Sequence, residues 1–506
     1  MQKKITFVNL CNIDFLSIST PPLALCSIVG YLIHKVGIPK SQIGFVEDTM
    51  FKANRALRTI INEEPKFVGI SIMSGEQTIP YIYLMMRIKE ELPNTCIIAG
   101  GTHASGIADS LLRRAPWLDI VVIGEGEIPL TQILYAGSNI GAEAKWAKIP
   151  NLMFKRRSGP KTGEIITTEQ KPLEFDMTDI KSYYPEHNLE FHGNITLEDS
   201  FCFSTKKSIN IPLETSRGCP YNCNFCMVPW VFKRKYRLRS VKAVIRDIKE
   251  MDAKFGQEAT GKPVRFLMYD ANFGMNPTWR AEWLQALNKL GKKIEWECET
   301  RLDKIDSKVM ARYSEAGLIQ SFVGIESGSE RVRKEILNKN FFLDRLLDTI
   351  KKTKDLVHFL AGYIIGAPSE TLEEIEETVM LASKLSQESG LNPPNHDHIA
   401  WSFKLYPKTY LTEHIDEYIK RGTKLLVDME WWMDPNTISF FSKHIEPSPG
   451  VTPSILEEMF NKFYEGVYGS DYREEGRLRY ENFLTEIIRT NAKKYLKRIS
   501  KAYPLY

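Results

Sequence analysis

The chain has few cysteines, little net charge and no long apolar run. Its 8 cysteines among 506 residues are too scattered for a disulfide framework. The longest nearly apolar stretch, residues 21–33, is shorter than the ~20 residues that cross a bilayer. Asn9, Asn12 and Asp14 interrupt the apolar region that an export signal needs. With 67 basic against 63 acidic residues, no global field marks a nucleic-acid or membrane partner, so we expect a cytoplasmic protein that neither spans a membrane nor binds nucleic acid.

Length and composition predict a multidomain globular enzyme. A chain of 506 residues exceeds a single ordinary core. Hydrophobic residues make up 43% and charged residues 26%, which excludes a disordered or fibrous chain. The sequence contains no internal repeat, no low-complexity segment and no helix-turn-helix signature, which argues against a non-catalytic sensor that binds DNA.

Two stretches of the chain alternate short β-rich runs with longer helix-like segments. We expect residues 1–136 to form a doubly wound, Rossmann-like parallel sheet and residues 209–402 to form a second β/α domain. Between them, residues 137–208 are predicted to be a linker with a hairpin, because a polar turn at 156–163 lies between two strand-like runs. Residues 403–506 are predicted to be mainly helical and to cap the domain before them. The predicted strands are 5–10, 44–47, 67–72, 96–99, 119–123, 211–215, 264–269, 294–299, 321–325 and 359–365.

Polar or glycine-rich turns follow the carboxyl ends of three strands in the first domain. They are residues 73–77, 100–105 and 124–127. In an open α/β sheet, ligands bind at the edge formed by the carboxyl ends of the strands. The sequence therefore predicts a ligand at this edge.

Three cysteines lie close together directly after a predicted strand. Cys219, Cys223 and Cys226 have the spacing C-x3-C-x2-C. Three thiolates on one loop can hold three corners of an iron–sulfur cubane, which leaves one iron without a protein ligand. A structural zinc site closes its shell with a fourth ligand. Further possible zinc ligands lie upstream, so that counting alone leaves zinc open: His187, His192 and Cys202.

The cysteine loop and the segments after it resemble the radical S-adenosylmethionine (SAM) superfamily. In that family the loop has this spacing and usually an aromatic residue before the third cysteine, where this chain has Phe225. The resemblance implies that Cys219, Cys223 and Cys226 bind a [4Fe-4S] cluster and that SAM chelates the open iron. It also implies cleavage of SAM to methionine and a 5′-deoxyadenosyl radical, inside a partial (β/α)6 barrel with its chemistry at the strand carboxyl ends.

The same resemblance implies candidate SAM contacts. Phe225 is expected near the adenine, and Gly366 ends a strand beside it. Arg301 is expected to meet the methionyl carboxylate, because bidentate pairing suits that group. Glu326 and Ser327 are expected to approach the ribose and the amino acid.

Residues 1–136 resemble the cobalamin-binding domain that precedes the radical domain in one large subclass, the class B radical SAM methylases. Small residues at strand ends would let a planar macrocycle lie across the sheet edge, with its nucleotide tail between strands. The Asp-x-His-x-x-Gly loop of free-standing cobalamin domains is not matched, since residues 48–53 lack its histidine and glycine. The lower cobalt ligand and the binding of cobalamin therefore stay open. The candidate cobalamin contacts are Ser71, Ser74, Gly100, Gly101, Thr102, His103, Gly124 and Glu125.

We interpret the chain as a cobalamin-dependent radical SAM methyltransferase that acts on an unactivated carbon of a small molecule. The alternative is a radical SAM enzyme for carbon-skeleton rearrangement or cyclisation whose first domain is empty. A tRNA methylthiotransferase fits less well, because Cys11, Cys26 and Cys96 are not expected to converge on a second cluster. A reductant protein such as flavodoxin or ferredoxin is implied, and the basic run 233–239 could attract it or an anionic substrate. Candidate pocket residues for an unidentified substrate are Trp401, Tyr406, Trp431 and Trp432.

Overall fold

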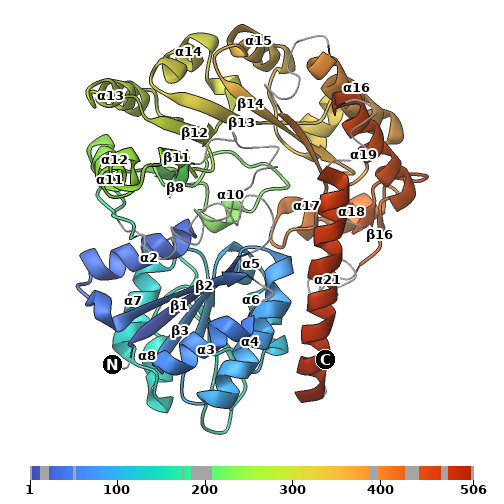
Figure 1. The fold of residues 1–506 in the computed structure, drawn as a ribbon. Coiled ribbons are helices and arrows are strands. Elements are labelled where there is room, and N and C mark those ends of the chain that lie inside the picture. The colour runs from blue at the N-terminus through green and yellow to red at the C-terminus, as the bar shows by residue number, and fades with distance from the viewer. Residues whose placement is uncertain are drawn as a thin grey trace.

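The computed structural model of the chain shows two α/β domains, one above the other in Figure 1. The structure describes residues 3–11, 22–49, 53–172, 176–183, 208–387, 397–427, 444–468 and 477–502. In these residues both sheets are mainly parallel, which confirms the predicted α/β fold class. The helices of the described segments include none with the length and apolar character that a membrane crossing requires.

The first domain is built on a seven-stranded sheet of order β2-β1-β3-β4-β5-β6-β7. Its strands β1, β3, β4 and β5 are buried on both faces, as strands of parallel sheets between helix layers are. Helices α2, α7 and α8 cover one face and α3, α4 and α6 the other. The strands are β1 Ile5–Cys11, β2 Ile43–Thr49, β3 Phe67–Ser71, β4 Cys96–Gly100, β5 Ile120–Val122, β6 Leu152–Lys155 and β7 Ile165–Thr167. The helices are α2 Leu23–His34, α3 Ala53–Glu63, α4 Thr78–Glu91, α5 Thr102–Gly106, α6 Ala108–Arg114, α7 Glu127–Ala136 and α8 Glu143–Trp146.

The predicted hairpin is present, but it belongs to the first sheet. Strands β6 and β7 pair antiparallel, and β6 also pairs with β5, so that Leu152 lies opposite Val122. The first domain therefore continues past the predicted boundary at residue 136. Sequence pattern revealed the turn of the hairpin but not which strand it would pair with, because that pairing is set by three-dimensional contact.

The second domain is a six-stranded parallel sheet of order β8-β11-β12-β13-β14-β15, a partial (β/α)6 barrel. Five of its strands were predicted from sequence, and the sixth, β15, was not. Its strands are β8 Ile209–Leu213, β11 Val264–Met268, β12 Glu295–Glu299, β13 Leu318–Glu326, β14 His358–Ile365 and β15 Asp397–Ser402. Its helices are α10 Val228–Val231, α11 Val241–Phe255, α12 Gln257–Thr260, α13 Pro277–Asn288, α14 Ser307–Glu315, α15 Leu343–Thr353 and α16 Leu372–Gln387.

The carboxyl-terminal region contacts both domains. Helix α19 (Pro453–Tyr468) lies against α16 of the barrel, as the predicted cap should. Helix α21 (Arg477–Ala502) instead packs against α4 of the first domain (Figure 1). There the ring of Tyr495 stacks on that of Tyr83 with the centroids 4.6 Å apart, and Ile499 joins the core of the first domain. The prediction that the whole region caps the barrel is therefore wrong for α21, whose residues Tyr495 and Ile499 are buried in the first domain.

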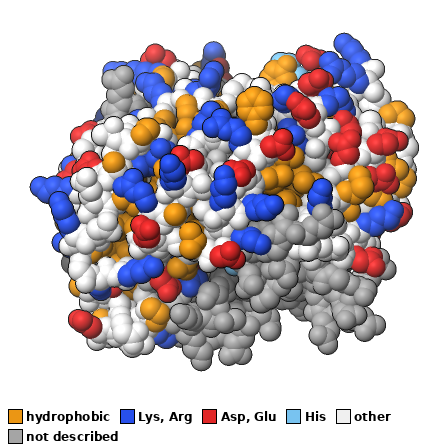
Figure 2. Space-filling view, turned by 90° about the horizontal axis from the view of Figure 1, so that it is seen from above, with side chains coloured by type: hydrophobic (Ala, Val, Ile, Leu, Met, Phe, Trp, Pro, Cys, Tyr) orange, Lys and Arg blue, Asp and Glu red, His pale blue; other side chains and the backbone are white. Residues whose placement is uncertain are grey.

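Basic and acidic side chains are interspersed on the face of the molecule seen in Figure 2. This agrees with the nearly balanced composition of 67 basic and 63 acidic residues. No broad field of one sign covers the described part of that face, so attraction of a charged partner must come from a local group of residues.

Candidate cofactor site at the junction of the two sheets

The loop that carries the three cysteines is closed at its base by a short hairpin. It runs from β9 (Ser216–Arg217) to α10, and β9 pairs antiparallel with β10 (Arg237–Leu238). Gly218 has φ +83°, and a Cβ there would lie 1.9 Å from the carbonyl oxygen of Lys235. Only glycine fits this position, because the backbone of the returning strand occupies the space of a side chain.

The far side of the cysteine loop is held by the segment that follows β13. The backbone N–H of Asn224 donates to the carbonyl oxygen of Leu337 at 2.9 Å, and its side-chain amide donates to Ile336 at 2.8 Å. In return, Asn338 donates to the carbonyl oxygen of Asn222 at 2.8 Å. The protein's own hydrogen bonds therefore fix the loop from two directions.

Polar donors face two of the three sulfur atoms. Arg301 Nη1 lies 3.9 Å from Cys223 Sγ, and Asn272 Nδ2 lies 4.0 Å from Cys219 Sγ. Burial raises the pKa of Cys223, against the opposing effect of nearby positive charges, and it raises the pKa of Cys226 to about 12. Thiols of this kind lose their protons when a metal binds, and N–H donors stabilise the resulting sulfur charge. The donor set fits an iron–sulfur cluster.

The zinc alternative finds no support in the described residues. Among them, no three His, Cys, Asp or Glu side chains are placed to hold one metal ion. In a cubane each cysteine binds a different iron, so its ligands need not converge on one point. The upstream residues His187, His192 and Cys202 lie outside the described residues.

The structure places Arg301 beside the cluster loop with most of its guanidinium already paired. Its Nε and Nη2 lie 3.0 and 3.3 Å from the two carboxylate oxygens of Asp303, and the group stacks 4.0 Å above the ring of Tyr221. Only the remaining edge of the guanidinium, Nη1, faces Cys223. The side chain is therefore oriented by protein partners and directs one donor edge at the cluster loop.

A buried group of charges lies at the end of β13 and includes a residue that sequence reasoning missed. Glu326 has a left-handed backbone, with φ 68°, and its Oε1 lies 2.5 Å from Lys339 Nζ. Lys339 also donates to the carbonyl oxygen of Gly324 at 2.9 Å. Burial raises the pKa of nearby Glu299 to about 7, against the pull of Lys339. Strained backbone at a residue other than glycine, as at Glu326, concentrates at functional sites. Lys339 is the residue that sequence reasoning missed, because no motif surrounds it.

Two other candidate SAM contacts shape the loops around this group. Ser327 Oγ is buried, lies 3.0 Å from Thr378 Oγ1 and accepts the N–H of Ser329 at 3.1 Å, so it ties its loop to α16. Gly366 has φ +84°, and its N–H donates to Glu370 Oε2 at 2.6 Å. Burial raises the pKa of Glu370 to about 8, although two backbone N–H groups oppose it.

The aromatic candidates occupy different environments. Phe225 packs against the small apolar cluster beside α17 (Tyr410–Glu413). Trp401 lies against Phe322 inside the barrel, with the ring centroids 5.8 Å apart, whereas Tyr406 is 37% exposed. Two other candidate pocket residues lie outside the described residues: Trp431 and Trp432.

At the carboxyl edge of the first sheet, glycines bring backbone segments close together and leave space beside them. Gly101 has φ +94°, and a Cβ there would lie 2.6 Å from the carbonyl oxygen of Ile72. Ser105 Oγ donates to the carbonyl oxygen of Gly101 at 2.7 Å and accepts the N–H of Gly124 at 3.0 Å. A Cβ on Gly100 or on Gly124 would meet no heavy atom nearer than 3.8 Å. This open cradle is of the kind that a bulky planar ligand needs.

The remaining candidates at this edge are mostly buried and held in place. His103 is 1% exposed, and burial lowers its pKa to about 4, so the ring is neutral. In the short turn Gly75–Gln77, Glu76 pairs with Lys404 of the barrel domain at 3.1 Å, and Gln77 accepts the N–H of Met73 at 2.9 Å. The other candidates surround this group: Ser71 ends β3, Ser74 precedes the turn and Thr102 begins α5.

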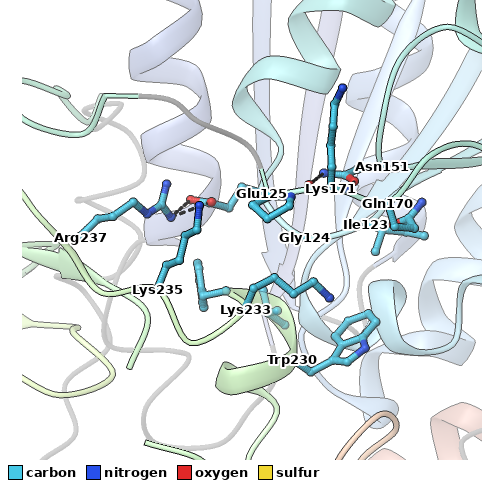
Figure 3. A pocket seen from close by; sticks show the side chains of 13 residues that line it. Ile123, Gly124, Glu125, Asn151, Gln170, Lys171, Trp230, Lys233, Lys235 and Arg237 are labelled. Carbon is cyan, nitrogen blue, oxygen red and sulfur yellow. Dashed lines mark hydrogen bonds and ion pairs between the residues drawn. The ribbon is translucent and has the colours of Figure 1, made fainter. Parts of the chain in front are cut away.

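A pocket with several charged side chains lies where the first sheet meets the cluster loop (Figure 3). It is lined by the turn after β5, by the β6–β7 hairpin, and by α10 with the turn that follows it. Figure 3 shows Arg237 and Lys235 directed at Glu125, while Lys233 and Trp230 lie on the α10 side. Glu125 was a candidate cobalamin contact, and its carboxylate is paired with Arg237 at 2.7 Å and with Arg217 at 2.9 Å.

The carboxyl edges of the two sheets face each other and touch. A Cβ on Gly106 of α5 would lie 3.1 Å from Met227 Cε, next to Cys226, and 2.7 Å from Pro407 Cγ. A partial barrel with three loop cysteines, joined edge to edge with a doubly wound sheet that has an open glycine cradle, defines the class of radical SAM enzymes with a cobalamin-binding domain.

Comparison with known families gives the same assignment. The Radical SAM superfamily matches residues 213–382, and the B12 binding domain matches residues 20–134. The chain is a radical SAM enzyme with an amino-terminal B12-binding domain. Its domains imply a [4Fe-4S] cluster, SAM and cobalamin as cofactors, and the sulfur donors and the glycine cradle fit these groups.

Several relatives match this chain over most of its length. An uncharacterized methyltransferase of Pyrococcus horikoshii is 28% identical over 419 residues, which cover 81% of each chain. The anaerobic magnesium-protoporphyrin IX monomethyl ester cyclase of Rubrivivax gelatinosus is 26% identical over 72% of this chain and 62% of the cyclase. Among solved structures, the radical SAM methyltransferase TsrM from Kitasatospora setae, with cobalamin and a [4Fe-4S] cluster bound, matches 99% of this chain and 100% of its own with a TM-score of 0.68 at 13% identity. At this identity the likeness concerns the fold.

Proposed function

We propose that the chain methylates an unactivated carbon of a small molecule, with a 5′-deoxyadenosyl radical removing the hydrogen and methylcobalamin supplying the methyl group. The observation that carries the proposal is the contact between the two carboxyl edges, where Met227 beside Cys226 lies against Gly106 of the first domain. Two cofactor edges in contact can serve one substrate, because proximity replaces diffusion between separate sites. The Pyrococcus horikoshii relative supports this reading. It is described as an uncharacterized methyltransferase, and the match covers 81% of its length.

The reaction balances with two molecules of SAM and an electron for each. One SAM accepts an electron and yields methionine and, after hydrogen abstraction, deoxyadenosine. Cobalamin held at the glycine edge would supply methyl-group transfer, so that the other SAM would yield S-adenosylhomocysteine and the second electron would restore the starting state. In this proposal Cys219, Cys223 and Cys226 hold the cluster. Arg301 directs a donor at it, and the glycine edge receives the corrin.

We propose Phe225, Glu326, Ser327 and Gly366 as the surroundings of SAM. The buried charges support this, because the Glu326–Lys339 pair offers both signs within 2.5 Å to a ligand that carries an ammonium and a carboxylate. In this proposal Ser327 and Gly366 position the loops around SAM through their hydrogen bonds to Thr378 and Glu370. At the other edge, the contacts proposed for cobalamin are Ser71, Ser74, Gly100, Gly101, Thr102, His103, Gly124 and Glu125.

A carbon-skeleton or ring-forming reaction is the second candidate. The similarity to a protoporphyrin ester cyclase favours it. In this case the first domain could be empty of cobalamin, with the cluster and SAM unchanged. A methylthiotransferase has less support, although chains of that kind are 23% identical over 67% of this chain. Cys26 lies inside α2 and Cys96 begins β4, and burial raises the pKa of both thiols.

We propose that the reductant is an acidic one-electron carrier such as flavodoxin or ferredoxin, and that it docks on the turn after α10. The side chains of Lys233, Arg234 and Lys235 are exposed there. Arg234 Nε lies 3.3 Å from the carbonyl oxygen of Pro220 in the cysteine loop, so the positive turn sits against the cluster loop. Complementary charge speeds the encounter of such partners.

The experiment that tests the function is a cobalt and product analysis. Protein purified without oxygen from cells supplied with cobalamin is expected to hold about one cobalt per chain. With reductant, SAM and cell extract, it is expected to add a methyl group to a small molecule and to form deoxyadenosine and S-adenosylhomocysteine. Intact iron and sulfide with no cobalt would favour the second candidate.

A further inference from the structure

Arg217 immediately precedes the cysteine loop, yet its side chain reaches into the first domain. The side chain is 8% exposed. Its Nη1 lies 2.9 Å from Glu125 Oε1 and its Nη2 lies 2.7 Å from Glu127 Oε1. Nη2 also donates to Ser27 Oγ at 2.8 Å, and Nε lies 2.7 Å from Glu214 Oε1. One guanidinium thus joins the strand before Cys219 to two segments of the first domain.

One of these two segments carries Glu125, a candidate cobalamin contact. Glu125 lies in the turn after β5, Glu127 begins α7, and Ser27 lies in α2. Arg237, on the strand that pairs with β9, donates to both carboxylate oxygens of Glu125 at 2.7 Å. The base of the cysteine loop is therefore tied to the turn after β5 by two adjacent strands.

The planar guanidinium is what allows one side chain to make all these contacts. Its fixed fork presents N–H groups in three directions, whereas a lysine ammonium is a point charge on a flexible stem. The carboxylates of Glu127 and Glu214 are 3% and 13% exposed, so removing Arg217 would leave buried charge uncompensated, whereas Glu125 would keep its pairing with Arg237. Burying these charges carries a desolvation penalty. Simple contact between the domains would not require it.

We propose that Arg217 is a positioning residue that fixes the cysteine loop against the Glu125–Glu127 turn and thereby sets the separation of the cluster and the corrin. The inference rests on the proposed function, in which both cofactors serve one substrate. Because displacements of about 1 Å can cost on the order of 100-fold in rate, a fixed separation decides whether each radical event ends in methyl transfer.

The test compares Arg217→Lys, which keeps the charge but loses the fork, with Arg265→Lys. Arg265 is a buried arginine, 2% exposed, that pairs with Glu297 at 3.1 Å near the amino end of β11 and inside the barrel. Both proteins are loaded with cluster and cobalamin. We expect Arg217→Lys to retain iron and cobalt but to form at least about tenfold more deoxyadenosine for each methyl transferred. Arg265→Lys is expected to keep the ratio of the wild type, whatever it loses in stability.

Two further readouts do not depend on turnover. The dipolar coupling between cob(II)alamin and the reduced cluster, measured by EPR spectroscopy, is expected to change in Arg217→Lys and not in Arg265→Lys. In protein without cofactors, amide hydrogen exchange of residues 124–127 and 214–219 is expected to speed up in Arg217→Lys alone. If Arg217→Lys does not fold, Glu127→Gln replaces it, because the amide keeps the shape and removes one ion pair.

An unchanged ratio, EPR coupling and exchange in the Arg217 variant overturn the proposal. If the wild type cleaves SAM but transfers no methyl group, the proposed function fails, while the EPR coupling still decides the role of Arg217. If the wild type holds no cobalt, hydrogen exchange decides it.

Discussion

The carboxyl edges of the two sheets, which meet in this molecule, differ in their residue types. The edge of the first sheet is made mainly of glycines, small polar residues and a buried histidine, and its shape is set by backbone contacts such as that of Gly101 with Ile72. Its carboxylates, Glu76 and Glu125, are already paired with cations. The barrel edge carries charges, among them the Glu326–Lys339 pair and Arg301 beside the cysteines. Under the proposed function, the first edge selects its ligand by space, and the second selects by charge and metal ligation.

The largest expected effect separates the two edges completely. Cys223→Ala should abolish deoxyadenosine formation, because a cubane with two protein ligands is not held for SAM cleavage. Its cobalt content should stay that of the wild type, since the first edge does not depend on the cysteines. Iron, cobalt and deoxyadenosine are measured on the same anaerobic preparation. Deoxyadenosine formation at the wild-type rate would contradict the role of Cys223 in holding a cluster that cleaves SAM.

The next largest effect concerns the exposed basic turn after α10 and the rate at which the cluster is reduced. The double change Lys233→Glu and Lys235→Glu should slow reduction of the cluster by flavodoxin by at least about tenfold at low salt, because electrostatic steering raises association rates by 10–1000-fold. Reduction by dithionite, a small reagent, should be unaffected. Rates are followed by the bleaching of the cluster absorbance. Equal slowing with both reductants would place the defect in the cluster and not in docking.

A pair of neighbouring glycines tests selection by space at the first edge. Gly101→Ala should lower the free energy of unfolding by roughly 1–2 kcal/mol or more, because the left-handed backbone disfavours a Cβ and Ile72 blocks it. Gly100→Leu should fold normally in the absence of cofactor, since space is open beside it, but should retain less cobalamin. Urea unfolding and cobalt content are the measurements. Full cobalamin retention in Gly100→Leu would place the corrin elsewhere.

The smallest effect is a difference in the response of the two edges to pH. His103 has a pKa of about 4 in the fold, so below its ordinary value of 6.5 the unfolded chain binds a proton that the folded chain does not. Its contribution to stability is therefore lost as the pH falls from 6.5 towards 4. Glu370 has a pKa of about 8, so the folded chain binds the extra proton and stability is lost as the pH rises from 4.5 to 8.

Two variants read these slopes separately. The stability of His103→Gln relative to the wild type should rise as the pH falls through 6.5, and that of Glu370→Gln should rise as the pH increases towards 8. Thermal unfolding at several pH values measures both. The same pH slope in both variants would contradict the assigned protonation states.

Local pattern predicted much of the fold and the centre of the site. The alternation of apolar runs and helical segments located five strands in each domain, and the cysteine spacing located the cluster loop. Strand β15 was missed, because Asp397 and His398 occupy its start and its apolar run is short. The docking of α21 on α4 was missed because it joins Tyr495 to a ring more than 400 residues earlier in the chain.

The parts of the site that escaped prediction depend on contacts distant in sequence. Arg217 pairs with Glu125, which is 92 residues away, and neither residue lies in a pattern that announces the other. Lys339 reaches Glu326 only because the loop after β13 turns back over the strand end. The contact of Arg301 with the methionyl carboxylate stays a prediction, and the sequence did not indicate that Asp303 would pair with two nitrogens of its guanidinium.

The most direct test of the central claim, that two joined edges serve one reaction, is the ratio of the two products of SAM. Reduced protein loaded with cluster and cobalamin is incubated with cell extract and SAM labelled in its methyl group. The account predicts that deoxyadenosine and S-adenosylhomocysteine form in equal amounts, with the label in a small-molecule product. Deoxyadenosine formed without S-adenosylhomocysteine, and a product without label, would contradict it.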